Sequence, residues 1–202
     1  MEIIGKAREL FMKYGIKSVT MDDVSRTLGI SKKTLYGEVA NKEDLIQKVL
    51  ELDRCSTEEE MDQLHSQAEN AIAHMALIVI TLVKKFREVS PVAIYDLQKY
   101  YGPLWSEMEA KRTSFVYHHI RENIKRGMNE GIYRKDLHPE IITRLYVEMS
   151  RTIVNEQVFP LEKYKRAQLL EQITSYHLNG IVNEKGYKIW EVYKKNIFHE
   201  DS

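Results

Sequence analysis

The sequence lacks the features that are typical of disulfide-rich, membrane-spanning and secreted proteins. It contains one cysteine, Cys55, so no disulfide can form within the chain and no thiolate metal cluster is expected. The most apolar stretch, residues 71–83, is shorter than a bilayer-spanning helix requires. The N-terminal residues are charged and show no apolar run typical of a secretory signal. We therefore expect a cytoplasmic protein that does not enter a membrane.

Proline and glycine are also scarce, with 4 and 9 residues among 202. Apolar residues recur at helical spacing along most of the chain, which predicts an all-α fold of about nine to ten helices. After the first 50 residues, helices are predicted over 68–86, 91–101, 104–129, 139–157 and 162–183, followed by a short docking helix after residue 186. The polar run 56–60 either begins a new helix or continues a long one.

The chain also has no excess of charge of either sign, because it contains 30 acidic and 30 basic residues. Affinity for DNA would therefore have to come from local placement of cations and from two copies per complex. Glycine-rich phosphate loops and the GxSxG, CxxC and HExxH patterns do not occur. We expect no catalytic residue, no cofactor and no metal. The adjacent His118 and His119 point apart on a helix, and no carboxylate joins them at ligand spacing.

The most informative segment that is present covers residues 20–39, which predict a helix-turn-helix hairpin. Thr20 is a candidate N-cap, and two aspartates follow in the first helical turn. Gly29 can adopt the left-handed backbone that closes this helix. Ser31 caps the next helix, whose first turn carries two lysines and a threonine. Such residues at a helix N-terminus are what a recognition helix presents to a major groove.

Two amphipathic helices flank the hairpin, one ending at Gly15 and one starting after Asn41. The N-terminal region contains five characteristic sequence segments, in this order: Ala7–Phe11, Tyr14-Gly15, Val19–Val24, Leu28–Tyr36 and Asn41–Leu45. Together these segments resemble the tetracycline-repressor (TetR) family, and residues 127–140 resemble the turn that precedes the dimer helices of that family. The resemblance implies a DNA-binding domain over 1–47 and an effector-binding and dimerisation domain over 48–202.

The resemblance further implies a ligand-responsive transcriptional repressor. Such a protein binds a palindromic double-stranded DNA operator as a homodimer and is released by a small-molecule effector. The residues that correspond to DNA contacts in the family are Thr20, Ser31, Lys32, Lys33, Thr34, Tyr36 and Lys42. Glu38 and Val39 depart from the family, which usually has aromatic or His-like residues there. Val39 can still fill the core, whereas Glu38 repels a phosphate, so one contact is missing or the helix is tilted.

An aromatic and methionine-containing cluster lies in the middle of the chain. Tyrosine and tryptophan combine an apolar body with a polar tip, which suits a ligand pocket, although such stripes are also typical of an ordinary core. By resemblance to the family, we assign the cluster to an effector cavity. Its members are Tyr95, Tyr101, Trp105, Met108, Phe115 and Tyr117.

Two apolar stripes near the C-terminus are implied by the same resemblance to form a four-helix dimer interface. The expected interface residues are Ile142, Leu145, Met149, Leu170, Ile173 and Ile181.

Two other classes of function stay open from the residues alone. The chain could be an all-helical ligand-binding protein or enzyme whose hairpin is incidental. It could also be a TetR-like protein that has lost DNA binding, as Glu38 suggests. Protection of upstream DNA by the purified protein separates the regulator from both alternatives.

Overall fold

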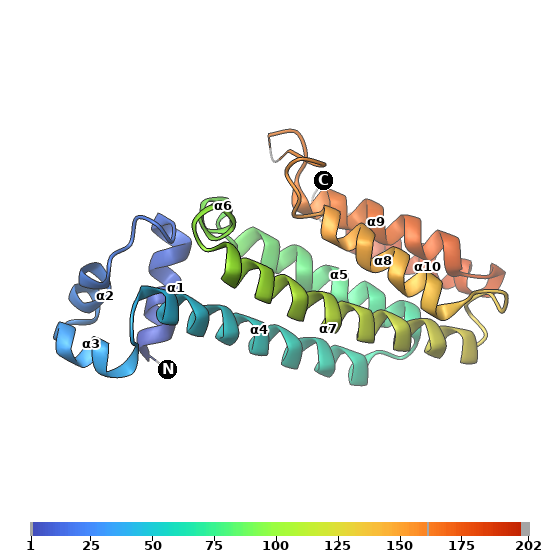
Figure 1. The fold of residues 1–202 in the computed structure, drawn as a ribbon. Helices are drawn as coiled ribbons and strands as arrows, with labels where there is room; N and C mark the ends of the chain where they lie inside the picture. The colour runs from blue at the N-terminus through green and yellow to red at the C-terminus, as the bar shows by residue number, and fades with distance from the viewer. Residues whose placement is uncertain (1, 161, 199–202) are drawn as a thin grey trace. The chain divides into compact units, whose positions relative to one another are not determined.

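The computed structural model describes residues 2–160 and 162–198. Within these residues the chain forms ten helices (Figure 1): α1 (Glu2–Tyr14), α2 (Met21–Leu28), α3 (Lys32–Glu38), α4 (Lys42–Gln67), α5 (Ala71–Glu88), α6 (Pro91–Tyr100), α7 (Gly102–Asn129), α8 (Pro139–Thr152), α9 (Arg166–Ile181) and α10 (Glu184–Phe198). The only β-pairing in the described part is an isolated bridge between Tyr133 and Val182. The all-α prediction is therefore confirmed. None of the described helices is long and apolar enough to cross a bilayer.

The polar run 56–60 continues a long helix, one of the two alternatives that the sequence leaves open, because α4 is continuous from Lys42 to Gln67. Helix boundaries differ from the sequence-based expectation nearer the C-terminus. The predicted helices over 139–157 and 162–183 are shorter, since α8 ends at Thr152 and α9 begins at Arg166. The Arg166 guanidinium donates hydrogen bonds to the carbonyls of Ile153 and Phe159, which stabilise the turns between them.

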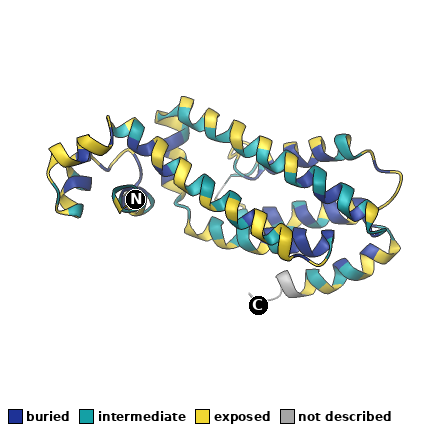
Figure 2. Ribbon diagram, turned by 90° about the horizontal axis from the view of Figure 1, so that it is seen from below, coloured by how far each residue is buried: buried dark blue, intermediate teal, exposed yellow. Residues whose placement is uncertain are grey.

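The chain divides into two compact units. The first contains residues up to Glu59 together with Arg87–Arg112, and the second contains Glu60–Phe86 together with residues from Thr113 onward. In each unit the buried residues gather on the inward faces of the helices (Figure 2). The first unit has a core of its own, formed by residues from α1 to α4 and by Ala93 and Leu97 of α6. The boundary at residue 47, which is a functional division, stays a prediction.

Capping interactions in the first unit place the helices of the hairpin. The Thr20 hydroxyl accepts from the Asp23 backbone N–H at 3.1 Å, and the Asp23 carboxylate accepts from the Thr20 N–H at 3.0 Å, which completes a capping box. Gly29 has φ +66°, and the N–H groups of Gly29 and Ile30 close α2. Ser31 accepts from the Thr34 N–H at 3.0 Å and starts α3. These caps confirm the helix ends predicted from the sequence.

The second unit is closed by a similar turn at the end of α7. Gly131 has φ +68°, and the N–H groups of Gly131 and Ile132 donate to the carbonyls of Met128 and Gly127. The chain then pairs with the end of α9, where Arg134 N–H donates to the Ile181 carbonyl at 2.9 Å. This turn therefore brings α7 and α9 together around the buried Tyr133.

Candidate nucleic-acid interface and effector region

Helix α3, the predicted recognition helix, has an exposed polar face and a buried apolar face. Leu35 is completely buried, and Val39 is 2% exposed at the helix C-cap, so both anchor α3 to the core. Val39 thus fills the core as expected from its apolar side chain. Five of the predicted DNA contacts are exposed along the start of α3: Ser31, Lys32, Lys33, Thr34 and Tyr36. Half of the Tyr36 side chain is accessible, which leaves its surface available to an approaching partner.

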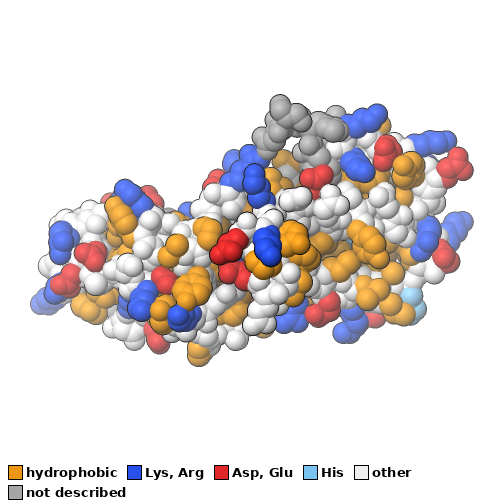
Figure 3. All heavy atoms as spheres, turned by 90° about the horizontal axis from the view of Figure 1, so that it is seen from above, with side chains coloured by type: hydrophobic (Ala, Val, Ile, Leu, Met, Phe, Trp, Pro, Cys, Tyr) orange, Lys and Arg blue, Asp and Glu red, His pale blue; other side chains and the backbone are white. Residues whose placement is uncertain are grey.

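The two lysines of α3 are electrostatically unequal. Lys32 Nζ lies 2.7 Å from Asp22 Oδ1 of α2, and both side chains are more than half exposed. Lys33 is exposed and has no ion-pair partner among the described residues. On the face drawn in Figure 3, acidic and basic side chains are interspersed. Lys33 is therefore the cation of α3 with the fewest internal competitors.

The side chains of Thr20 and Lys42 already form hydrogen bonds within the chain. The Thr20 hydroxyl takes part in the capping box, and its hydrogen bonds are the main cause of the lowered pKa of Asp23. Lys42 is half-buried at the start of α4, and its Nζ donates to the Lys17 carbonyl at 3.1 Å. Burial lowers the pKa of Lys42, although the nearby Asp96 and Asp23 oppose this shift. A phosphate contact from Lys42 would thus have to compete with an existing hydrogen bond.

A contact between α6 and the turn after α1 was not visible in the sequence. Asp96 is 6% exposed, and its Oδ2 accepts from the Lys17 N–H at 2.8 Å. Gly15 in the same turn has φ +84°, and a Cβ there would lie 2.9 Å from Asp96 Oδ2. Asp96 therefore fixes α6 to the turn that also receives Lys42. The two partners are 79 residues apart in sequence, so no local pattern could have paired them.

Residues 3–49 match the family model described as bacterial regulatory proteins, tetR family. This match covers α1, α2, α3 and the start of α4. Residues 3–49 therefore form a TetR-type helix-turn-helix segment, as found in bacterial regulatory proteins.

Three known transcriptional regulators are similar to this chain over most of its length. The HTH-type transcriptional regulator YvaF of Bacillus subtilis (strain 168) is 23% identical over 83% of this chain and 88% of its own length. A TetR transcription regulator from Haloarcula marismortui superposes with a TM-score of 0.74 at 18% identity, covering 90% of this chain and 97% of its own. FadR from Bacillus subtilis in complex with stearoyl-CoA has a TM-score of 0.68 at 17% identity, with 90% and 98% covered.

The predicted effector residues do not all belong to one compact unit of the chain. Tyr101, Trp105 and Met108 are partly buried against the core of the first unit. Tyr95 is 46% exposed on α6, where its hydroxyl accepts from Lys99 at 2.6 Å. The remaining two residues lie in the second unit.

Phe115 packs on the core of the second unit, and Tyr117 donates a hydrogen bond to Glu140. Helical spacing identified an apolar face of α7 but could not show which layer each turn of that face contacts. An effector role for the six residues stays a prediction.

The predicted dimer residues differ in what they expose. Leu145 is 57% exposed, and Ile142, Met149 and Ile173 are partly buried. Leu170 and Ile181 are each only 2% exposed, so they support α9 from inside their own chain and have little surface left for a partner. Tyr176 of α9, which belongs to the same apolar stripe of the sequence, is 73% exposed. The exposed side chains of Tyr176 and Leu145 show that α8 and α9 have apolar surface open to solvent.

Proposed function

We propose that this protein is a ligand-responsive repressor that binds a palindromic operator as a homodimer. The observation that carries the proposal is the exposed N-terminal half of α3, held by the Ser31 cap and anchored by the buried Leu35. Lys32, Lys33 and Thr34 would lie at the major groove, where they face base edges and phosphates. Tyr36 would place its hydroxyl on a phosphate. We propose no catalytic activity for the chain.

The experiment that tests this function is protection of DNA by the purified protein. The DNA upstream of its own coding sequence is digested with and without protein, and a protected, two-fold symmetric site is expected. Half-sites should lie about one helical turn or more apart, because two copies of α3 read them. Absence of any protected site at micromolar protein would contradict the proposal.

Effector release is proposed by linkage. A ligand that binds the DNA-free state better than the DNA-bound state weakens operator binding by the same factor by which DNA weakens ligand binding. Typical couplings of about 1–3 kcal/mol correspond to release by about 5–150-fold. FadR, whose structure holds stearoyl-CoA, shows that a protein of this fold accommodates a ligand. The continuous α4, which begins at Lys42, is the proposed lever.

Replacing Asp22 by asparagine should strengthen DNA binding. The change removes the carboxylate that holds Lys32 Nζ at 2.7 Å and that would itself face the phosphates. An exposed ion pair of this kind contributes about 0–1 kcal/mol, so we expect a few-fold gain in affinity per dimer. The measurement is operator affinity at several salt concentrations, where Asp22→Asn should steepen the salt dependence. An unchanged slope would show that Lys32 does not contact phosphate. Asp136→Asn, an exposed aspartate of the second unit, is the matched control.

Truncating Leu145 should weaken the proposed dimer. Leu145→Ala removes apolar surface from both copies of a two-fold interface, with a loss of about 1 kcal/mol in each. The dimer dissociation constant should rise by about 30-fold, measured by sedimentation equilibrium. Val158→Ala is the control, because Val158 is 48% exposed but lies in the turns after α8. A monomeric parent protein at micromolar concentration would contradict the dimer itself.

A further inference from the structure

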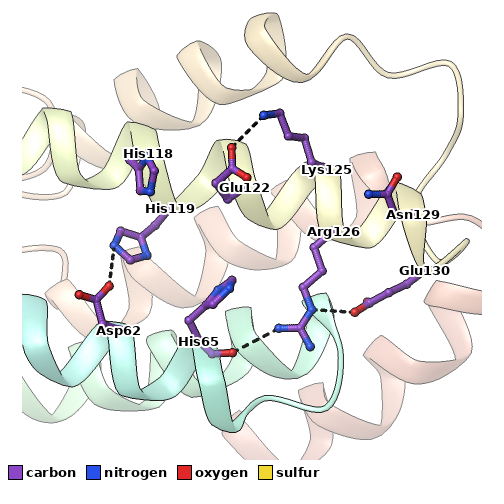
Figure 4. Close-up of a pocket in the computed structure, with 9 residues that line it drawn as sticks. All are labelled: Asp62, His65, His118, His119, Glu122, Lys125, Arg126, Asn129 and Glu130. Carbon is purple, nitrogen blue, oxygen red and sulfur yellow. Dashed lines mark hydrogen bonds and ion pairs between the residues drawn. The ribbon is translucent and has the colours of Figure 1, made fainter.

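The second unit contains a polar pocket that none of the predicted site residues lines. Its volume is about 600 Å³, and it lies between the C-terminal part of α4 and the C-terminal half of α7. Figure 4 shows the lining side chains: Asp62, His65, His118, His119, Glu122, Lys125, Arg126, Asn129 and Glu130. All nine are polar. Pockets of about 300–1,000 Å³ accommodate small molecules, so this one has the volume of a small-molecule site.

The cations of the pocket are already matched by acidic or carbonyl groups. Lys125 Nζ lies 2.9 Å from Glu122 Oε1, and Arg126 Nε lies 2.7 Å from Glu130 Oε1. The Arg126 guanidinium also donates to the carbonyls of His65 and Ala68, at 3.3 and 2.6 Å. Neither cation is therefore open to an anionic ligand without breaking these contacts. The pocket does not suit a carboxylate or a phosphate.

One carboxylate of the pocket lacks such compensation. Asp62 has no lysine or arginine partner among the described residues, and its side chain is 70% exposed. Its neighbour is the imidazole of His119, whose Nε2 lies 3.4 Å from Asp62 Oδ1. Apart from its histidines, the lining has three carboxylates against two cations. This excess of negative charge favours a cationic ligand at the Asp62 end.

The histidines around Asp62 are held in place by packing. The ring of His119 stacks on Phe115 at a centroid distance of 4.0 Å, and His65 stands edge-on to His74 at 4.7 Å. His74 is completely buried, and burial lowers its pKa to about 4, so it is neutral near pH 7. Neutral imidazoles have one acceptor nitrogen each. The Asp62 end of the pocket thus combines a carboxylate with imidazole rings that packing holds in place.

We propose that this pocket binds the primary ammonium group of a small, polar organic cation, with Asp62 as its counter-ion. The inference rests on the proposed function, because this cation would be the effector. An ammonium group offers three donors, which suit a carboxylate and imidazole nitrogens. The ligand would join Asp62 and His65 of α4 to residues of α7, and α4 continues without a break to Lys42. Binding would therefore favour one spacing of these two helices.

The test uses the full-length protein and 1,5-diaminopentane as the probe, measured by titration calorimetry at low salt. The uncharged 1,5-pentanediol, of the same length, is the matched ligand. We expect the diamine to bind at least 10-fold more tightly than the diol. Asp62→Asn should weaken diamine binding by about 10-fold or more, because a charge-assisted hydrogen bond is lost. Asp136→Asn, an exposed aspartate outside the pocket, should leave it unchanged.

Equal binding of the diol and the diamine would overturn the proposed ligand class, and so would an unchanged diamine affinity in Asp62→Asn. A third such result is that the protein does not bind the diamine but binds ZnCl₂, and that Asp62→Asn abolishes the binding of ZnCl₂. Operator protection is measured on the same preparation without ligand. If the protein protects DNA but does not bind the diamine, the proposal of a cationic effector is rejected and the proposed function as a repressor stands. If the protein binds the diamine but protects no DNA, the proposed function is rejected and the proposed ligand site stands.

Discussion

Replacing Gly127 by alanine should lower the free energy of unfolding by about 3 kcal/mol. A Cβ at Gly127 would lie 2.2 Å from Cδ2 and 2.3 Å from Cε2 of Tyr133, far inside van der Waals contact. Tyr133 is completely buried, and its hydroxyl donates to Asn123 Oδ1 at 2.9 Å, so the ring cannot move aside without losing that bond. Overpacking of this kind costs about 1–3 kcal/mol, and occasionally more. The melting temperature should fall by about 6–12 °C for a chain of this size.

Gly5→Ala is the matched control for that experiment. Gly5 lies within α1, where an added Cβ meets no atom within 4 Å. Alanine there should stabilise the helix by up to about 1 kcal/mol, because glycine has more backbone freedom to lose on folding. Thermal unfolding followed by circular dichroism measures both variants. If Gly127→Ala melts with the parent, the close approach of Tyr133 to α7 is not as the structure has it.

Local chemistry made the DNA-binding hairpin predictable. Thr20, Gly29 and Ser31 each act through backbone groups within five residues, so their roles as caps and turn follow from residue type and spacing. Asn41 likewise accepts from the Asp44 N–H at 2.9 Å, as expected of a helix N-cap. The sequence also predicts which side of α3 is exposed, because Leu35 is apolar and the residues on either side of it are polar.

Long-range pairings could not be predicted in the same way. His119 and Asp62 come from α7 and α4, and only the packing of these helices brings them to 3.4 Å. The aromatic residues of α6 and α7 illustrate a related limit. Their spacing indicated a buried face, but Trp105 and Phe115 pack on the cores of different units. A period of 3.6 residues identifies a face of a helix and carries no information about its neighbour.

Reversing the charge of Lys33 should have the largest effect on operator binding. Lys33→Glu removes the α3 cation that has no internal ion-pair partner and places a carboxylate against the DNA. We expect a loss of about 2 kcal/mol in each half-site, from the lost attraction and the added repulsion. A dimer carries the change twice, so affinity should fall by about 1,000-fold. Fluorescence anisotropy with the protected DNA site measures this loss.

Lys185→Glu separates a contact at α3 from a general effect of charge. Lys185 is exposed on α10 in the second unit, and its reversal changes the net charge of the chain by the same amount. It should leave operator affinity within a few-fold of the parent, because screening removes most of its influence beyond about 8–10 Å. Lys33→Ala should also flatten the salt dependence by about one unit of slope per half-site, whereas Lys185→Ala should not. Equal losses in both glutamate variants would mean that DNA senses the overall charge and that α3 does not read the operator.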